Sequence, residues 1–84
     1  MAIRTTRSQV IFNNPFTLAE VDGSLAAGTY DIDTDEEVFE GNVRTVYVRT
    51  ATLIHIRRPG GTRTVTIDPS GLAAALQMDA LQSE

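Results

Sequence analysis

Apolar and polar positions alternate along most of the chain before residue 69. In residues 28–34, Tyr30 and Ile32 alternate with Asp31 and Asp33. Successive side chains of a strand point to opposite faces, so this segment predicts a strand with one apolar and one acidic face. Residues 8–12 and 16–18 show the same alternation and predict two further extended segments.

Turn residues separate these segments. The predicted turns lie at Asn13-Asn14-Pro15, at Asp22-Gly23-Ser24 and at Ala27-Gly28. Each contains residues that tolerate turn geometry or form it through their own side chains. A fourth turn, Pro59-Gly60-Gly61-Thr62, predicts a tight hairpin, because consecutive glycines supply positive φ angles without strain.

Residues 34–41 are compatible with two structures. Thr34 and Glu37 have the spacing of a capping box, and Gly41 is suited to end a helical turn. The alternative is a strand that continues to Glu40. We favour the helical turn, and this choice implies that Asp31, Asp33 and Asp35 do not form one surface.

Residues 43–58 form the longest extended candidate. Val46, Val48, Ile54 and Ile56 share one parity, and large side chains occupy the other parity as well, so we expect both faces to be covered. Sixteen residues are long for one strand, so we expect a bend or bulge at residues 50–52. Residues 62–68 return as the second strand of the hairpin.

A helix is predicted over residues 69–82. Asp68 is a favourable N-cap, and Pro69 is tolerated at the first helical position. Leu72, Leu76 and Ala80 lie on one stripe, with Ala73, Ala75 and Leu81 beside it. The stripe predicts that this helix packs against the sheet.

These elements predict a single domain over residues 1–84, with a flexible stretch at 1–7, a β-rich part at 8–68 and a helix at 69–82. The fold class is mainly β (α+β). We expect a small antiparallel rolled sheet, or a partly open barrel, of four or five strands with one C-terminal helix.

Composition narrows the function classes. The net charge is −4 and the chain has no cysteine, and all seven basic residues are arginines. The acidic balance argues against nucleic-acid binding, and the absence of cysteine excludes thiolate metal sites and disulfides. No apolar run is long enough to span a bilayer, and residues 1–7 lack the apolar stretch of a signal peptide. We expect a cytoplasmic protein without membrane contact.

Two motifs that suggest chemistry fail on inspection. The Asp31-x-Asp33-x-Asp35 spacing is that of a calcium loop, but Glu36 and Asn42 stand where such a loop needs glycine and glutamate. His55 is the single histidine, and no nucleophile motif accompanies it. We therefore predict no metal, no cofactor and no catalytic residue, with His55 on the less buried face of a strand.

The candidate partner-binding residues are all charged. They are Asp31, Asp33, Arg57, Arg58 and Arg63. The two aspartates form either cross-strand pairs with arginines or an acidic surface for a basic partner. The three arginines flank the glycine hairpin, where they form either an anion-binding patch or a solvated strand end that resists edge-to-edge pairing.

The chain resembles a family of small uncharacterised proteins of alphaproteobacteria. The resemblance covers roughly residues 10–80 and rests on these segments: Pro15-Phe16-Thr17-Leu18, Ala27-Gly28-Thr29-Tyr30, Thr34-Asp35-Glu36-Glu37, Glu40-Gly41, Arg49-Thr50-Ala51-Thr52 and Val65-Thr66-Ile67-Asp68-Pro69. Residues 42–47 depart from the family, which is more aromatic there. The family carries no assigned activity, so the resemblance implies a shared fold alone.

Because catalytic residue types are scarce, the sequence favours a non-enzymatic protein-interaction or structural module, with another protein or a second copy in a homodimer as partner. Its contacts are expected on an exposed strand edge or on the acidic stripe. The alternatives are a phage-type inhibitor or acidic nucleic-acid mimic, and a small ligand-binding or enzymatic domain that gathers Asp31, Asp33, His55 and arginines in one cleft.

Overall fold

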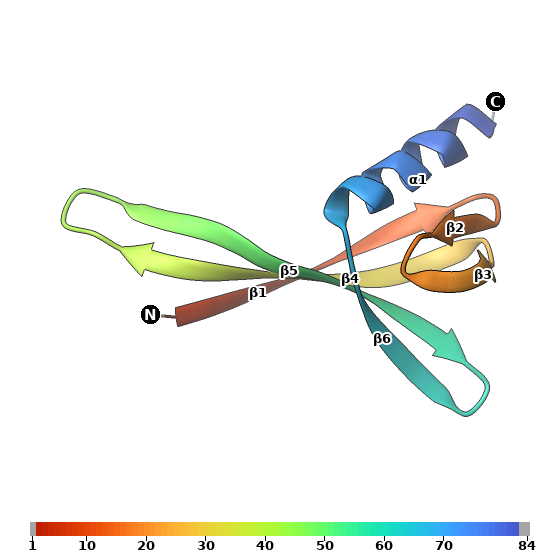
Figure 1. Ribbon diagram of the computed structural model, residues 1–84, viewed down its shortest axis with the longest axis horizontal. Helices are drawn as coiled ribbons and strands as arrows, with labels where there is room; N and C mark the ends of the chain where they lie inside the picture. Colours follow the sequence, from red (N-terminus) through yellow and green to blue (C-terminus); the bar gives the residue numbers. More distant parts are fainter. Residues whose placement is uncertain (1, 83–84) are drawn as a thin grey trace.

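Most of the extended segments form one antiparallel sheet in the computed structural model, which describes residues 2–82 (Figure 1). In spatial order its strands are β1 (Ala2–Phe12), β4 (Gly28–Glu40), β5 (Thr45–Arg58) and β6 (Gly61–Ile67). Two short strands, β2 (Phe16–Leu18) and β3 (Val21–Leu25), pair separately, and the helix α1 (Pro69–Gln82) follows β6. The predicted fold class is confirmed, and the sheet stays open instead of closing into a barrel.

The hydrophobic core lies at one end of the sheet, beside α1 and the β2–β3 hairpin. Its residues are Phe12, Phe16, Leu18, Val21, Leu25, Ile32, Ile54, Ile56, Ile67 and Leu72. The rings of Phe12 and Phe16 stack with their centroids 3.5 Å apart, and Tyr30 meets both rings edge-on. The position predicted for Ile32 on the apolar face of its strand is confirmed, and Phe12 and Ile67 are buried with it.

The helix begins as predicted but buries a different stripe. Asp68 accepts hydrogen bonds at Oδ1 from the backbone N and the hydroxyl of Ser70, which confirms it as the N-cap. Leu72 and Asp79 are buried, with Ala75 and Leu76 packed between them. Ala80 and Leu81 are exposed, so their predicted place on the covered side was wrong. The buried position on the last turns belongs to Asp79.

Residues 34–40 continue β4, so the helical turn favoured over residues 34–41 was wrong. Every residue from Thr34 to Val38 has a partner on β1 and another on β5. A lone helical turn is costly to nucleate and satisfies few backbone groups. Pairing on both sides of the strand satisfies far more of them, and this outweighs the local capping signal.

A bulge in β5 confirms the irregularity predicted at residues 50–52. Asp35 pairs with Ala51, whereas Glu36 pairs with Arg49, so Thr50 is the extra residue. One extra residue moves all following side chains to the other face. Val46 and Val48 therefore lie on the other face of the sheet from Ile54 and Ile56. The prediction that all four share one face was wrong.

Other boundaries also differ from the sequence predictions. β1 begins at Ala2, so residues 2–7 are strand instead of a flexible lead-in; Met1 lies outside the described residues. The β2–β3 turn lies at residues 19–20, between the paired residues Leu18 and Val21. The turn predicted at 22–24 is instead part of β3, where Gly23 takes a φ of 79° at an irregular pairing.

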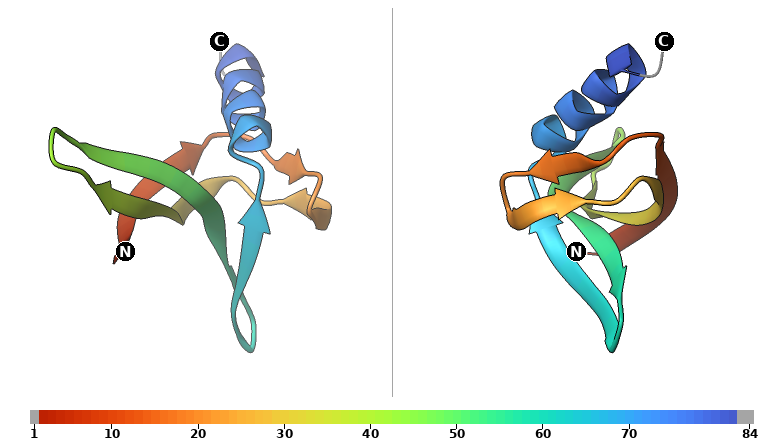
Figure 2. Two further views of the ribbon diagram at one scale, coloured as in Figure 1. Left: turned by 60° about the vertical axis from the view of Figure 1, so that its left-hand side comes forward. Right: turned by 90° about the vertical axis from the view of Figure 1, so that its right-hand side faces the viewer.

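The β4–β5 hairpin extends far beyond the core. We call residues 36–49 the arm; the first residues of β1 run beside it (Figures 1 and 2). The described chain measures 47 × 34 × 19 Å and has a radius of gyration of 15.1 Å. A globular chain of this length has a radius of about 12 Å. No core residue belongs to the arm, which accounts for the elongated shape.

Candidate interaction surfaces

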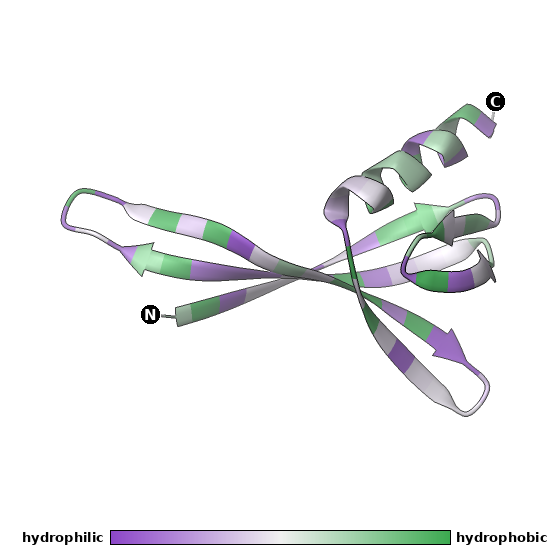
Figure 3. Ribbon diagram, in the orientation of Figure 1, coloured by the Kyte–Doolittle hydropathy of each residue, from purple (hydrophilic) through white to green (hydrophobic). Residues whose placement is uncertain are grey.

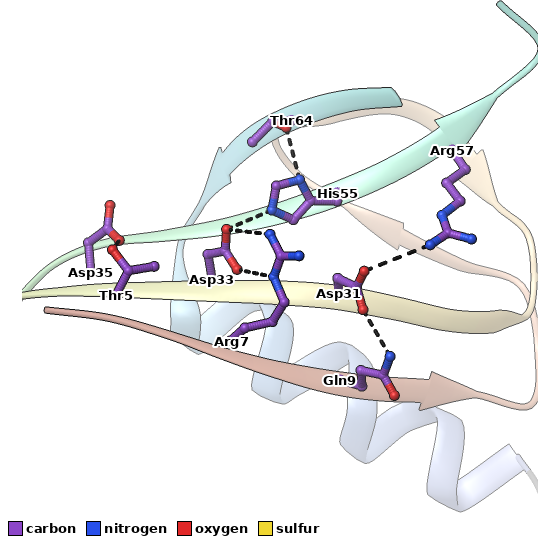
Figure 4. A network of polar contacts seen from close by, with 9 residues as sticks. All are labelled: Thr5, Arg7, Gln9, Asp31, Asp33, Asp35, His55, Arg57 and Thr64. Atoms are coloured by element: carbon purple, nitrogen blue, oxygen red, sulfur yellow. Dashed lines mark hydrogen bonds and ion pairs between the residues drawn. The ribbon is translucent and has the colours of Figure 1, made fainter. Parts of the chain in front are cut away.

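Asp31, Asp33 and Asp35 form one row on the outer face of the sheet, the face opposite the core (Figure 4). They occupy alternate positions of β4, and β4 continues as a strand through all three. The inference that they do not share a surface was therefore wrong, because it depended on the helical turn.

Each aspartate of the row already has a partner on β1. The Nε of Arg7 donates to Asp33 at 2.8 Å, and the Nε2 of Gln9 donates to Asp31 at 3.0 Å. The hydroxyl of Thr5 donates to Asp35 at 2.7 Å. Pairing of the predicted aspartates with arginines is confirmed for Asp33 by Arg7. For Asp31 it is looser, because the nearest guanidinium nitrogen, from the exposed Arg57, lies 3.9 Å away.

Asp33 also contacts His55 from the neighbouring strand. The Nε2 of His55 lies 2.8 Å from Oδ2 of Asp33, and its Nδ1 lies 3.0 Å from the hydroxyl of Thr64 (Figure 4). The hydrogen bonds from Arg7 and then from His55 lower the pKa of Asp33 to about 2. His55 lies on the outer face, as predicted. The Thr64 hydroxyl, the His55 imidazole and the Asp33 carboxylate thus form a hydrogen-bonded chain. The guanidinium of Arg7 also binds the carboxylate.

The arginines of the β5–β6 hairpin do not form one patch. Arg57 pairs with Thr62 and lies on the outer face with Asp31. Arg58 is its immediate neighbour, and Arg63 pairs with Ile56, so both lie on the opposite face. The five predicted partner-binding residues are therefore divided between the two faces of the sheet.

A hollow of about 320 Å³ lies beside this polar network. Its lining includes Gln9, Tyr30, Asp31, His55 and Arg57. Asp31, His55 and an arginine thus meet around one concavity, whereas Asp33 lies beside it. Among residues 2–82, no group of three or more histidine, aspartate or glutamate side chains is arranged to hold a metal ion.

Apolar side chains are exposed on both faces of the arm. Figure 3 shows hydrophobic residues along both of its strands. Six of the nine large apolar side chains that the described chain exposes lie on the arm or beside it: Ile3, Phe39, Val43, Val46, Tyr47 and Val48. Both faces were predicted to be covered, but residues 45–50 are exposed throughout. Solvent-facing clusters of this kind mark interaction sites in soluble proteins.

The two faces of the arm differ in chemistry. On the inner face, Tyr47 pairs with Val38, and the guanidinium of Arg4 lies 4.1 Å from the centre of the Tyr47 ring. Arg4 also reaches Glu36 at 2.6 Å. On the outer face, Phe39 pairs with Val46, and Val48 lies beside Glu37.

The outer edge of β5 is unpaired along the arm. β6 pairs with β5 from Thr52 to Arg58 and leaves residues 45–51 with β4 alone among the described strands. An unpaired edge presents a row of backbone donors and acceptors to other chains.

Asp79 is a buried acidic side chain that sequence reasoning missed. Only 6% of it is exposed, and its carboxylate accepts hydrogen bonds from the backbone N of Asn13 and of Asn14. These bonds, that of Asn13 first, lower the pKa of Asp79. The available signal was its spacing of seven residues from Leu72, which places a carboxylate on the apolar stripe of α1.

The described residues include no helix that is both long and apolar enough to cross a membrane. Comparison of the chain with protein-family models, with curated proteins and with solved structures finds no match in any of the three. The resemblance to small alphaproteobacterial proteins stays a prediction.

Proposed function

We propose that the protein is a non-enzymatic interaction or structural module, acting in the cytoplasm, that binds another protein surface through its arm. The observation that carries the proposal is the arm itself, which projects from the core and exposes apolar side chains on both faces. A monomer gains nothing in stability from apolar groups that stay in water. Their burial against a partner supplies the free energy for binding.

The arm fits this role better than the acidic row does. A basic partner or a nucleic-acid-binding protein would need carboxylates that are free to accept new bonds. The carboxylates of Asp31, Asp33 and Asp35 are each engaged by β1. Competing with those contacts would cost a partner part of the binding energy it gains.

The test compares variants of the arm with a matched variant elsewhere. Val46→Asp places a charge on the outer face of the arm, and Ile11→Asp places the same charge on β1, where Ile11 is 64% exposed. We expect Val46→Asp to abolish association, read by light scattering and by pull-down from the native host, and Ile11→Asp to retain it. Equal behaviour of both variants and the unmodified chain would contradict the proposal.

A second candidate function is small-ligand binding in the hollow lined by Asp31, His55 and Arg57. The observation in its favour is that these polar side chains converge on one concavity. A screen of small anions and polar metabolites by thermal shift would support it if a hit disappears in His55→Ala. A hit that survives His55→Ala would place the ligand elsewhere.

A further inference from the structure

We infer that the occupant of the arm is a second copy of this chain, whose residues 45–49 pair antiparallel with the same residues about a two-fold axis at Tyr47. The inference rests on the proposed function and names its partner. It joins the two sheets edge to edge into one continuous sheet across the axis, with β5 of each copy at the centre.

The unpaired edge of β5 has a sequence that favours pairing with another strand. Residues 45–49 read Thr-Val-Tyr-Val-Arg, a run of β-branched and aromatic residues without proline or glycine. Their outer edge is unpaired among the described strands. Edge strands are normally protected by prolines, by several charges or by a covering segment. Here the protection amounts to one arginine and the bulge at Thr50.

Charged residues on the inner face favour a second copy of the chain as the partner. They also favour one register of the antiparallel pairing. Arg49 lies beside Glu36, and Glu40 lies beside Thr45. Neither Arg49 nor Glu40 forms an ion pair with any residue in 2–82. When Tyr47 stands opposite Tyr47 of the second copy, Arg49 stands opposite the second copy's Thr45, and Glu40 of that copy is the next residue across. Two-fold symmetry repeats this contact, so the arm is complementary to itself.

Neighbouring registers lose this match. An axis at Val48 places Arg49 against the second copy's Tyr47 and Thr45 against its Ala51, so Glu40 finds no arginine. An axis at Val46 moves Arg49 beyond the strand of the second copy, which begins at Thr45. Of the registers that keep inner face with inner face, the one at Tyr47 brings the unpaired charges together.

Apolar rows also become continuous in this register. On the inner face, Val38 and Tyr47 meet Tyr47 and Val38 of the second copy. On the outer face, Phe39 and Val46 meet Val48 of the second copy. Side chains that are directly opposite across antiparallel strands lie about 5 Å apart at Cβ and stabilise the pairing. Apolar side chains that are exposed in one chain are thus in contact with apolar side chains of the second copy.

The chain contains no cysteine, which makes disulfide trapping a clean test. At the axis, residue 47 of each copy lies within the roughly 4.5–5.5 Å Cα separation of antiparallel partners, a distance that a disulfide spans. We expect Tyr47→Cys to form a covalent dimer on mild oxidation. Ile11→Cys, at a more exposed position away from the arm, should form no covalent dimer. A mixture of Val46→Cys and Val48→Cys cross-links to the heterodimer in preference to either homodimer.

Light scattering of the unmodified chain provides the second readout. The expected mass is twice the 9.1 kDa of one chain. Tyr47→Glu opposes two carboxylates at the axis and should weaken the dimer roughly tenfold or more, whereas Ile11→Glu leaves it intact. A dimer that resists Tyr47→Glu and cross-links as readily through Ile11→Cys would overturn the inference.

The two proposals fail in different ways. A monomer at every soluble concentration whose arm captures a host protein, and loses it on Val46→Asp, overturns the second-copy inference and leaves the proposed function standing. A monomer whose arm variants change nothing overturns both.

Discussion

His55 lies one diagonal step from Asp33 across β4 and β5, and its Nε2 is 2.8 Å from the Oδ2 of that carboxylate. Arg7 donates to the same carboxylate from β1, so Asp33 links three strands through side chains alone. The aspartates of the row therefore connect neighbouring strands of the sheet.

The first prediction concerns acid stability. The pKa of Asp33 is lowered to about 2, first by Arg7 and then by His55, below the roughly 3.9 of an unfolded aspartate. The carboxylate thus stabilises the fold above about pH 4, and this contribution is lost as the pH falls toward 2. Asp33→Asn should lose less stability than the unmodified chain between pH 5 and about pH 2.5, as measured by urea unfolding. Asp22→Asn, an exposed change of the same charge, is the control; identical pH dependence in all three proteins would refute the prediction.

A buried hydroxyl gives the second prediction. Thr52 is 4% exposed, and its Oγ1 has no hydrogen-bond partner among the described residues. A buried polar group without a partner costs free energy, and valine has nearly the same shape. Thr52→Val should raise the free energy of unfolding by about 1 kcal/mol. Thr66→Val, on an exposed position of β6, should change it by less than about 0.5 kcal/mol. Loss of stability in Thr52→Val would show that the hydroxyl is satisfied.

The third prediction tests the anchor of the helix. Asp79→Ala removes the acceptor for the backbone N–H groups of Asn13 and Asn14, so both groups and the end of α1 lose their link. Asp22→Ala removes the same charge from an exposed position. We expect Asp79→Ala to lower the melting temperature clearly below that of Asp22→Ala and to speed amide exchange at residues 13 and 14. Equal melting temperatures would mean that α1 is held by Leu72 and its neighbours alone.

Two glycines supply a fourth prediction with opposite signs. Gly60 has a φ of 95° in the β5–β6 turn, whereas Gly71 lies inside α1, and a Cβ at either position meets open space. Gly60→Ala should cost roughly 1–2 kcal/mol, because a side chain disfavours positive φ. Gly71→Ala should stabilise by roughly 0.5–1 kcal/mol, because alanine favours the helix. Chemical denaturation of the two variants measures both, and changes of the same sign would contradict the backbone argument.

Local patterns were sufficient to predict most of the elements. Alternation at Tyr30 and Ile32, glycines at the β5–β6 turn and the N-cap at Asp68 act within a few residues, so they are visible in the sequence. Residues 34–40 show the limit of this approach. Their capping box is a real local signal, but the strands that outweigh it come from β1 and β5, far away in the chain.

The candidate interaction surfaces were also predicted only in part, because some of their contacts join residues far apart in the chain. The sequence predicted that Asp33 pairs with an arginine, but it did not identify that arginine as Arg7. Residues 1–7 were predicted to be flexible, whereas β1 begins at Ala2 and places Arg7 beside Asp33. Asp79 was missed because its partners lie 65 and 66 residues away. The apolar side chains of the arm were read as core because residue type alone does not reveal that nothing in the chain covers them.

The separation of arm and core has a consequence for how this protein can change. All ten core residues among residues 2–82 lie outside the arm, so folding places little constraint on the sequence of the arm. Under the proposed function, substitutions in the arm change what the arm binds at small cost to folding. The arm is in this sense a replaceable part. Under the same proposal, exchanging its strands for those of another hairpin redirects binding, while the core residues Phe12, Ile32 and Ile54 keep the scaffold unchanged.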